Sequence, residues 1–159
     1  MSVRTAEVEW VGGFNDGEGT IVSTGTGTIS NVGVSWRSRV DDVEGQTSPE
    51  ELLAAAHAAC FAMQFVYGLV GAGAEPEEVH VSAKVHFEPG VGITDSALTA
   101  RVVVSGLPDD KIVEIAERAK LGCPITRALA AVDVSLDLPD YAPEPDEDGQ
   151  PTAETATAE

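Results

Sequence analysis

Apolar and polar residues alternate along several short segments of the chain, and a repeat of two residues is typical of β-strands with one buried face. Glycine-containing and acidic turns separate these segments, which form one group near the N-terminus and another in the later half. The pattern predicts strands over residues 6–11, 20–23, 33–40, 78–88, 98–104 and 132–138, with an acidic loop at 41–47.

The segment that follows Ser48 has a different pattern, because it is apolar on nearly every side. Ser48 is a good N-cap, Pro49 suits the first helical position, and Glu51 follows Ser48 at the spacing of a capping box. We therefore expect a helix over 50–70, ended by Gly71, at the centre of the fold or at an interface. Polar side chains interrupt this helix, so we expect that it does not span a membrane. These side chains are Glu50, Glu51, His57, Cys60 and Gln64.

Two further helices are expected near the C-terminus, over 108–120 and 124–131, with Pro124 opening the second. The resulting order, β-β-β-α-β-β-α-α-β, is that of an α+β protein, and the hairpins at its start predict mainly antiparallel sheets. Residues 1–138 form one domain on this interpretation. Residues 139–159 contain almost nothing apolar, and we expect them to be a disordered acidic tail.

Composition narrows the class of function. The chain has 159 residues, which suits one domain, and its 27 acidic residues against 9 basic ones give a formal charge of −18. A surface this acidic is repelled by phosphate backbones, so nucleic acid is not an expected partner. The N-terminus lacks the apolar stretch of a secretory signal, and we expect a cytoplasmic protein that does not bind membranes.

The two cysteines, Cys60 and Cys123, are the first candidates for chemistry. They do not form a CxxC motif and have no zinc-ligand spacing, so they are either buried apolar side chains or redox groups. The apolar setting of Cys60 raises a thiol pKa, whereas Cys123 precedes a helix whose N–H groups favour a thiolate. A reactive Cys60 therefore requires a positive partner from elsewhere in the fold.

The strand expected at 33–40 offers two such cations. Arg37 and Arg39 are two residues apart, so both would point to one face of that strand. Either could hold a thiolate and a peroxide oxygen, or the face could simply be solvated. Glu50 complements the helix dipole in the first turn, and it could also orient an arginine through a bidentate ion pair.

The spacing between Glu50 and Cys60 limits how they can act together. Ten residues on one helix correspond to about 15 Å, which is too far for two side chains to share a small site. If both residues serve one reaction, the glutamate must come from a second subunit. This spacing predicts a homodimer with two equivalent composite sites.

The histidines are weaker candidates. His57 lies one turn before Cys60, where the two side chains can touch, and a Cys–His pair can be nucleophilic. A histidine on an apolar helix is more often a satisfied core residue. His80 and His86 are expected on the surface of one strand, with no third ligand for a metal.

The segment Thr47–Phe61, TSPEELLAAAHAACF, closely resembles the signature of the OsmC/Ohr family of peroxide-detoxifying proteins, and GCPIT at 122–126 resembles the second cysteine motif of that family. The resemblance covers residues 6–138 and is greater to the OsmC branch than to the Ohr branch. It implies that Cys60 is the peroxidatic thiol and Cys123 the resolving thiol, which close a disulfide. It also implies that Arg39, rather than Arg37, activates the thiolate and that Glu50 pairs with this arginine.

The same resemblance implies an intertwined α+β homodimer with antiparallel sheets around a long central helix. Its expected substrates are organic hydroperoxides, and hydrogen peroxide less well. Its expected reductant is an external dithiol, such as a dihydrolipoyl protein, and no metal or organic cofactor is needed. Two alternatives stay open: a non-catalytic, stress-induced dimeric binding protein, and a thiol hydrolase that uses Cys60 and His57.

Overall fold

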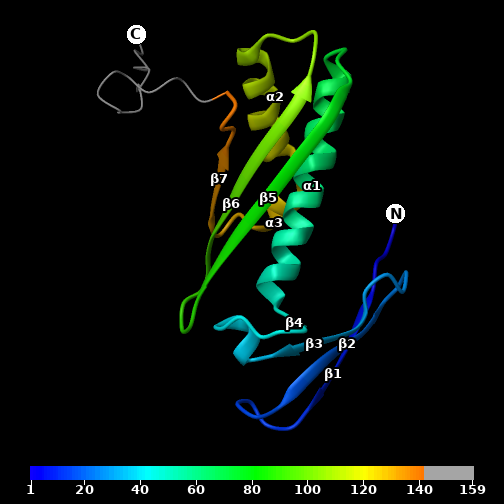
Figure 1. Ribbon diagram of the computed structural model, residues 1–159, viewed down its shortest axis with the longest axis vertical. Helices are drawn as coiled ribbons and strands as arrows, with labels where there is room; N and C mark the ends of the chain where they lie inside the picture. The colour runs from blue at the N-terminus through cyan, green and yellow to red at the C-terminus, as the bar shows by residue number, and fades with distance from the viewer. Residues whose placement is uncertain (142–159) are drawn as a thin grey trace.

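Two separate β-sheets and one long helix form the framework of the protein in a computed structural model, which describes residues 1–141 (Figure 1). In the N-terminal sheet, β1, β2 and β3 are antiparallel neighbours and β4 joins β3 in parallel. Its strands are β1 (Ala6–Val11), β2 (Glu18–Thr24), β3 (Ser30–Ser35) and β4 (Gln46–Thr47).

The second sheet is built on a long antiparallel hairpin, to which the last strand of the chain adds in parallel. Its strands are β5 (Pro76–Glu88), β6 (Gly92–Val104) and β7 (Asp133–Asp137). The expected α+β class and the antiparallel hairpins are confirmed. The parallel additions of β4 and β7 were not predicted, because a parallel neighbour is reached through a crossover that the strand pattern does not reveal.

The helices follow the expected order. They are η1 (Arg37–Arg39), a 3₁₀ turn, and the α-helices α1 (Pro49–Gly71), α2 (Asp109–Gly122) and α3 (Pro124–Ala128). The predicted cap of the long helix is confirmed, since the side chain of Ser48 accepts a hydrogen bond of 3.1 Å from the backbone N–H of Glu51. Cys123 is the residue between α2 and α3, so it ends one helix and precedes the next.

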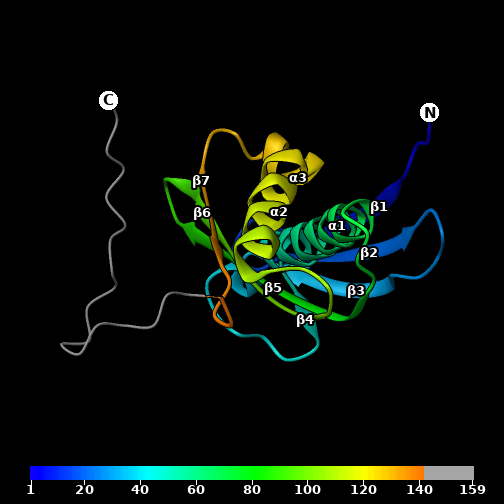
Figure 2. The same ribbon diagram turned by 90° about the horizontal axis from the view of Figure 1, so that it is seen from above.

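The core lies between β6 and the helices α1 and α2, which lie side by side on one face of the second sheet (Figure 2). Gly68 lets the two helices approach closely, because a Cβ at that position would lie 2.7 Å from the side chain of Ile115. The buried core residues are Phe61, Phe65 and Leu69 on α1, Leu98, Ala100 and Val102 on β6, and Ile112, Ile115, Ala116 and Ala119 on α2.

The predicted strand over 33–40 is wrong after Ser35, where the chain turns into η1. The backbone N–H groups of Ser35 and Ser38 each donate to the other's hydroxyl at 3.1 Å, and the Ser38 hydroxyl donates to the carbonyl of Thr47 at 2.7 Å. Serine side chains that bond nearby backbone groups compete with strand pairing, which explains the turn. Arg37 and Arg39 therefore do not share a strand face.

Part of the apolar surface is left uncovered in a single chain. On the outer side of α1, Met63 is 69% exposed and Tyr67 is 75% exposed. Val8 on β1 and Phe14 in the following turn are also exposed. By length and composition alone α1 would qualify as a membrane-spanning helix, but its inner side belongs to the protein core.

The folded region extends slightly past the expected boundary at residue 138. Asp140 forms an ion pair of 2.5 Å with Arg101, and the hydroxyl of Tyr141 donates to the carbonyl of Val102 at 3.4 Å. Two residues of the tail expected to start at 139, Asp140 and Tyr141, are therefore in contact with the domain. The rest of that expected tail, 142–159, lies outside the described residues.

Candidate active site

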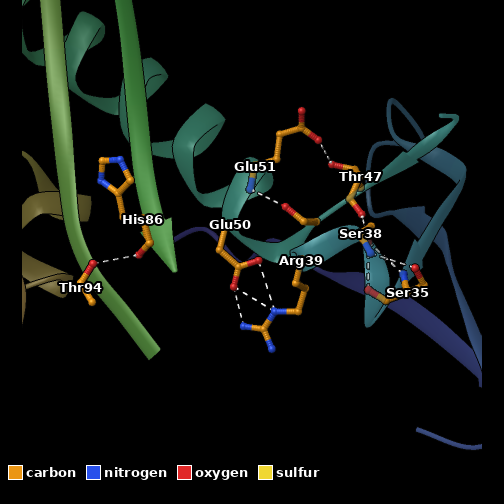
Figure 3. Close-up of polar contacts among 9 residues, drawn as sticks. Ser35, Ser38, Arg39, Thr47, Glu50, Glu51, His86 and Thr94 are labelled. Atoms are coloured by element: carbon orange, nitrogen blue, oxygen red, sulfur yellow. Dashed lines mark hydrogen bonds and ion pairs between the residues drawn. The ribbon is translucent and has the colours of Figure 1, made fainter. Parts of the chain in front are cut away.

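An arginine–carboxylate pair occupies the start of α1 (Figure 3). Arg39 donates from Nη2 to Oε1 of Glu50 at 2.5 Å, and its Nε lies 3.0 Å from Oε1 and 3.3 Å from Oε2 of the same carboxylate. The side chain of Glu50 is only 8% exposed and that of Arg39 is 29% exposed. Arg37, the alternative, instead pairs with Asp41 at the surface with both side chains largely exposed. Folding therefore directs Glu50 to Arg39.

Aromatic rings support the guanidinium of Arg39. Its central carbon lies 4.1 Å from the ring centre of Phe87 and 5.5 Å from that of Trp36. Phe14 packs on Trp36 with ring centres 4.6 Å apart. A guanidinium held by a carboxylate and two rings has a fixed plane.

A groove of about 1010 Å³ opens beside this pair. Besides Arg39 and Glu50, it is bordered by Lys84, His86 and Phe87 of β5 and by acidic side chains of the loop that follows η1. Those acidic side chains are Asp41, Asp42 and Glu44. Nδ1 of His86 forms a hydrogen bond of 2.6 Å with Oδ1 of Asp95. This bond is the main cause of the lowered pKa of the Asp95 carboxyl.

The two cysteines, far apart in sequence, are brought together where the middle of α1 meets the start of α3. Both are free thiols, with Cys60 partly buried and Cys123 fully buried. The two thiols lie close enough for each to shift the pKa of the other, and the backbone N–H of Ile125 lowers the pKa of both. The pair is therefore already adjacent in the reduced protein.

The two thiols differ in acidity. Burial is the main cause that raises the pKa of Cys60, and the hydrogen bond with Cys123 adds to it. Burial alone would raise the pKa of Cys123 too. The pKa is nevertheless lowered overall, first by the backbone N–H of Thr126 and then by Cys60, the Thr126 hydroxyl and the N–H of Ile125. Among the described residues, no cation contributes to the pKa of Cys60. That Cys60 requires a positive partner from elsewhere stays a prediction.

His57 points into the core rather than acting as a base for Cys60. Its Nδ1 lies 2.8 Å from the hydroxyl of Ser96, and its Nε2 lies 2.8 Å from the hydroxyl of Thr126. The side chain is fully buried, and this burial lowers its pKa. Both ring nitrogens are engaged by hydroxyl groups, so the direct Cys60–His57 pair that the hydrolase alternative requires is absent.

Ser96 and Thr126 were missed by the sequence interpretation. Ser96 lies on a strand among apolar residues, and it is fully buried. A polar side chain at an inward-facing strand position indicates a buried partner, which is the signal that could have located it. Thr126 belongs to the GCPIT segment, but its contact with His57 depends on how α3 docks against α1.

Because His57 is buried, the free energy of unfolding should depend on pH. Its pKa in the folded protein is below the ordinary value of 6.5, so the unfolded chain binds a proton more readily in the interval between the two pKa values. The stabilisation by neutral His57 is complete above about pH 6.5 and is lost as the pH falls through the folded-state pKa. In that interval the free energy of unfolding should fall by up to ~1.4 kcal/mol per pH unit.

Urea unfolding of the wild type and of His57→Gln over this interval measures the effect. We expect the difference between the two free energies of unfolding to shrink as the pH falls. Parallel curves for the two proteins would show that His57 does not titrate differently in the folded and unfolded states.

Two adjacent thiols on an α+β scaffold with a long helix and two sheets define a protein of the OsmC-like fold, and comparison with known proteins agrees. The family model described as OsmC-like protein matches residues 41–137. The chain belongs to the OsmC family. Peroxiredoxin OsmC of Escherichia coli strain K12 is 35% identical over 137 residues, which covers 84% of this chain and 94% of that protein.

Solved structures show the same fold. An organic hydroperoxide resistance protein OsmC from Legionella pneumophila has a TM-score of 0.62 and 24% identity, covering 87% of this chain and 100% of that one. An OsmC-like protein from Vibrio cholerae has a TM-score of 0.67 and 21% identity, with coverage of 87% and 99%. Among the described residues, no group of three or more His, Cys, Asp or Glu side chains could hold a metal ion.

Proposed function

We propose that the protein is a thiol-dependent peroxidase for oxidative-stress defence, which reduces organic hydroperoxides to alcohols, and hydrogen peroxide less well. The observation that carries this proposal is that the free thiols of Cys60 and Cys123, which are far apart in sequence, lie close enough for each to shift the pKa of the other. The relationship to a protein named peroxiredoxin OsmC supports the same class of reaction.

The proposed cycle uses the two sulfurs in turn. The Cys60 thiolate attacks the O–O bond, and the alcohol leaves after taking up one proton while Cys60 becomes a sulfenic acid. The Cys123 thiol then condenses with the sulfenic acid, forming the disulfide and releasing water. An external dithiol, such as a dihydrolipoyl protein, restores both thiols by exchange. No metal or organic cofactor takes part.

Activation of Cys60 is assigned to Arg39 and Glu50 of a second subunit. Within one chain Glu50 and Cys60 are separated by ten residues of α1, about 15 Å along the helix. The guanidinium would stabilise the thiolate and the departing oxygen, while Glu50 fixes its plane. The rings of Phe87 and Trp36 beside it would suit an apolar peroxide.

The uncovered apolar surface supports a homodimer. A helix that is apolar on nearly all sides has only its inner side covered in one chain, and the outer side carries the exposed Met63 and Tyr67. Large exposed apolar patches mark interaction sites, and a second copy of α1 offers the same surface in a two-fold arrangement. This dimer would bring the arginine–glutamate pair of one subunit toward the thiols of the other.

Anaerobic treatment of the reduced protein with one equivalent of cumene hydroperoxide tests the proposal. We expect stoichiometric cumyl alcohol and a protein mass lower by two hydrogen atoms, with a Cys60–Cys123 linked peptide after digestion. A dithiol should then restore the original mass. Unchanged thiols and unreacted peroxide would instead support the non-catalytic dimeric binding protein.

A further inference from the structure

Most charges around the groove beside Arg39 are held in pairs. Arg39 itself is paired with Glu50, and Nε of Arg37 lies 3.5 Å from Oδ2 of Asp41 in the loop that follows η1. His86, which borders the groove from β5, is paired with a carboxylate of β6 at 2.6 Å. None of these pairs carries an excess of positive charge, so the electrostatic character of the groove depends on the side chains that remain.

Three carboxylates remain and form an acidic border of the groove, those of Asp42, Glu44 and Glu51. Asp42 and Glu44 are exposed, and Glu51 accepts a hydrogen bond of 2.6 Å from the neutral hydroxyl of Thr47 (Figure 3). None of the three carboxylates forms an ion pair within residues 1–141. Lys84 of β5 also lines the groove, but one ammonium group against three carboxylates leaves an excess of negative charge.

The guanidinium of Arg39 is the group in this groove that would bind an anion. Its Nε and Nη2 donate to Glu50, whereas Nη1 has no hydrogen-bond partner in the part of the chain that the structure describes. The Arg39 side chain is 29% exposed. A guanidinium with free N–H groups binds carboxylates in general, so soluble carboxylates would compete with a peroxide for it. The acidic border opposes this competition, because it repels anions that enter the groove.

We propose that the acidic border makes the peroxide site selective for uncharged and cationic hydroperoxides, and unfavourable for hydroperoxides that carry a carboxylate. The inference rests on the proposed function, because it names the substrate class of that same site. An uncharged peroxide reaches Arg39 without the electrostatic cost that a carboxylate meets at Asp42, Glu44 and Glu51. The reaction itself is unchanged, and every accepted hydroperoxide gives its alcohol and the sulfenic acid of Cys60.

This selectivity should depend on ionic strength. Exposed charges act over about 30 Å at ~0.01 M salt but only over about 10 Å at ~0.1 M. We therefore expect added KCl to raise the rate for a carboxylate-bearing hydroperoxide relative to the rate for an uncharged one. The ratio of the two rates is the useful measure, because it cancels any effect of salt on the stability of a chain with a formal charge of −18.

Three hydroperoxides of similar shape test the inference: cumene hydroperoxide, its para-carboxylate and the methyl ester of that carboxylate. The ester controls for the added size, and dithiothreitol serves as an uncharged reductant. At ~0.01 M salt we expect the wild-type kcat/KM for the carboxylate to be roughly 3- to 10-fold below that for the ester, as steering by surface charge allows. Equal values for the carboxylate and the ester at every KCl concentration would overturn the inference.

Two double variants separate the acidic border from the charge of the whole chain. Asp42→Asn/Glu44→Gln removes two charges at the groove. Glu77→Gln/Asp110→Asn removes two exposed charges in the first residues of β5 and α2, which begin near the other end of α1 (Figure 1). We expect the first variant to bring the ratio of carboxylate to ester toward one, and the second to keep the wild-type ratio. An equal change in both would assign the selectivity to net charge and overturn the inference.

Inhibition by benzoate gives a second readout that does not depend on an anionic substrate. Benzoate should inhibit the reduction of cumene hydroperoxide more strongly in Asp42→Asn/Glu44→Gln than in the wild type, whereas uncharged benzamide should act equally on both proteins. Unchanged inhibition by benzoate would show that the border does not shield Arg39, against the inference. Failure of the wild type to reduce even cumene hydroperoxide would instead refute the proposed peroxidase, and the inference with it.

Discussion

Replacement of Cys60 by serine is expected to lower hydroperoxide reduction by at least about 10³-fold, since a serine hydroxyl at neutral pH is a far weaker nucleophile than a thiolate. No other described thiol can take over the first step, because Cys123 is fully buried beside α1. Peroxide consumption in the presence of a dithiol, followed anaerobically, measures the loss.

Cys123→Ser is the matched control for this prediction. It keeps the peroxidatic thiol, so it should still consume one equivalent of hydroperoxide and accumulate a sulfenic acid on Cys60, which a sulfenic-acid reagent can trap. The two variants therefore separate the first step from the second. Equal activity of Cys60→Ser and the wild type would end the proposed mechanism.

The second large effect concerns which subunit supplies the arginine that acts on Cys60. Arg39→Ala and Glu50→Ala should each lower activity by about 10²-fold, as expected when a positioned charge that stabilises the transition state is lost. If the site is composite, co-expression of Arg39→Ala with Cys60→Ser should restore activity. Half of randomly formed dimers are mixed and each has one intact site of two, so recovery should reach roughly a quarter of wild type.

Arg39→Ala mixed with Glu50→Ala is the control. In such a mixed dimer each site contains one defective member of the pair, so activity should stay low. Purification of the mixed dimer through two different tags removes the contribution of the parent dimers. If the Arg39→Ala and Cys60→Ser mixture also stays inactive while dimers form, the active site must lie within one chain.

These two results bear on why a single chain holds its thiols and its arginine apart. The long helix α1 carries Glu50 in its first turn and Cys60 near its middle, and the rigid rise of a helix keeps them separated. The same helix exposes an apolar side that a second copy could cover. One element would thus set both the assembly and the distribution of the catalytic groups.

Local sequence patterns predicted most of the strands, the start of α1 and the relative acidity of the two thiols. The period of two identified the strands, and Ser48, Pro49 and Glu51 located the start of α1, because strand alternation and helix capping depend on near neighbours in the chain. The acidity order of the thiols also followed from local context, since Cys123 lies beside free N–H groups and Cys60 lies inside an apolar helix.

Contacts between distant segments decided the rest. The 3₁₀ turn at η1 was predicted as strand, because the hydrogen bond from Ser38 to the Thr47 carbonyl forms only when β4 lies beside β3. Local reasoning left open whether Arg37 or Arg39 pairs with Glu50. In the folded protein Glu50 pairs with Arg39.

The sequence by itself determined the α+β class and the capped central helix, because each depends on residues a few positions apart. The reactive groups that it predicts rest on the family resemblance. Only the tertiary structure decided that Cys60 and Cys123 lie close together and that His57 lies between two hydroxyls. Those contacts join β6, α1 and α3. The packing of three separate elements cannot be predicted from a local sequence pattern. Their geometry follows from burial of the shared apolar core.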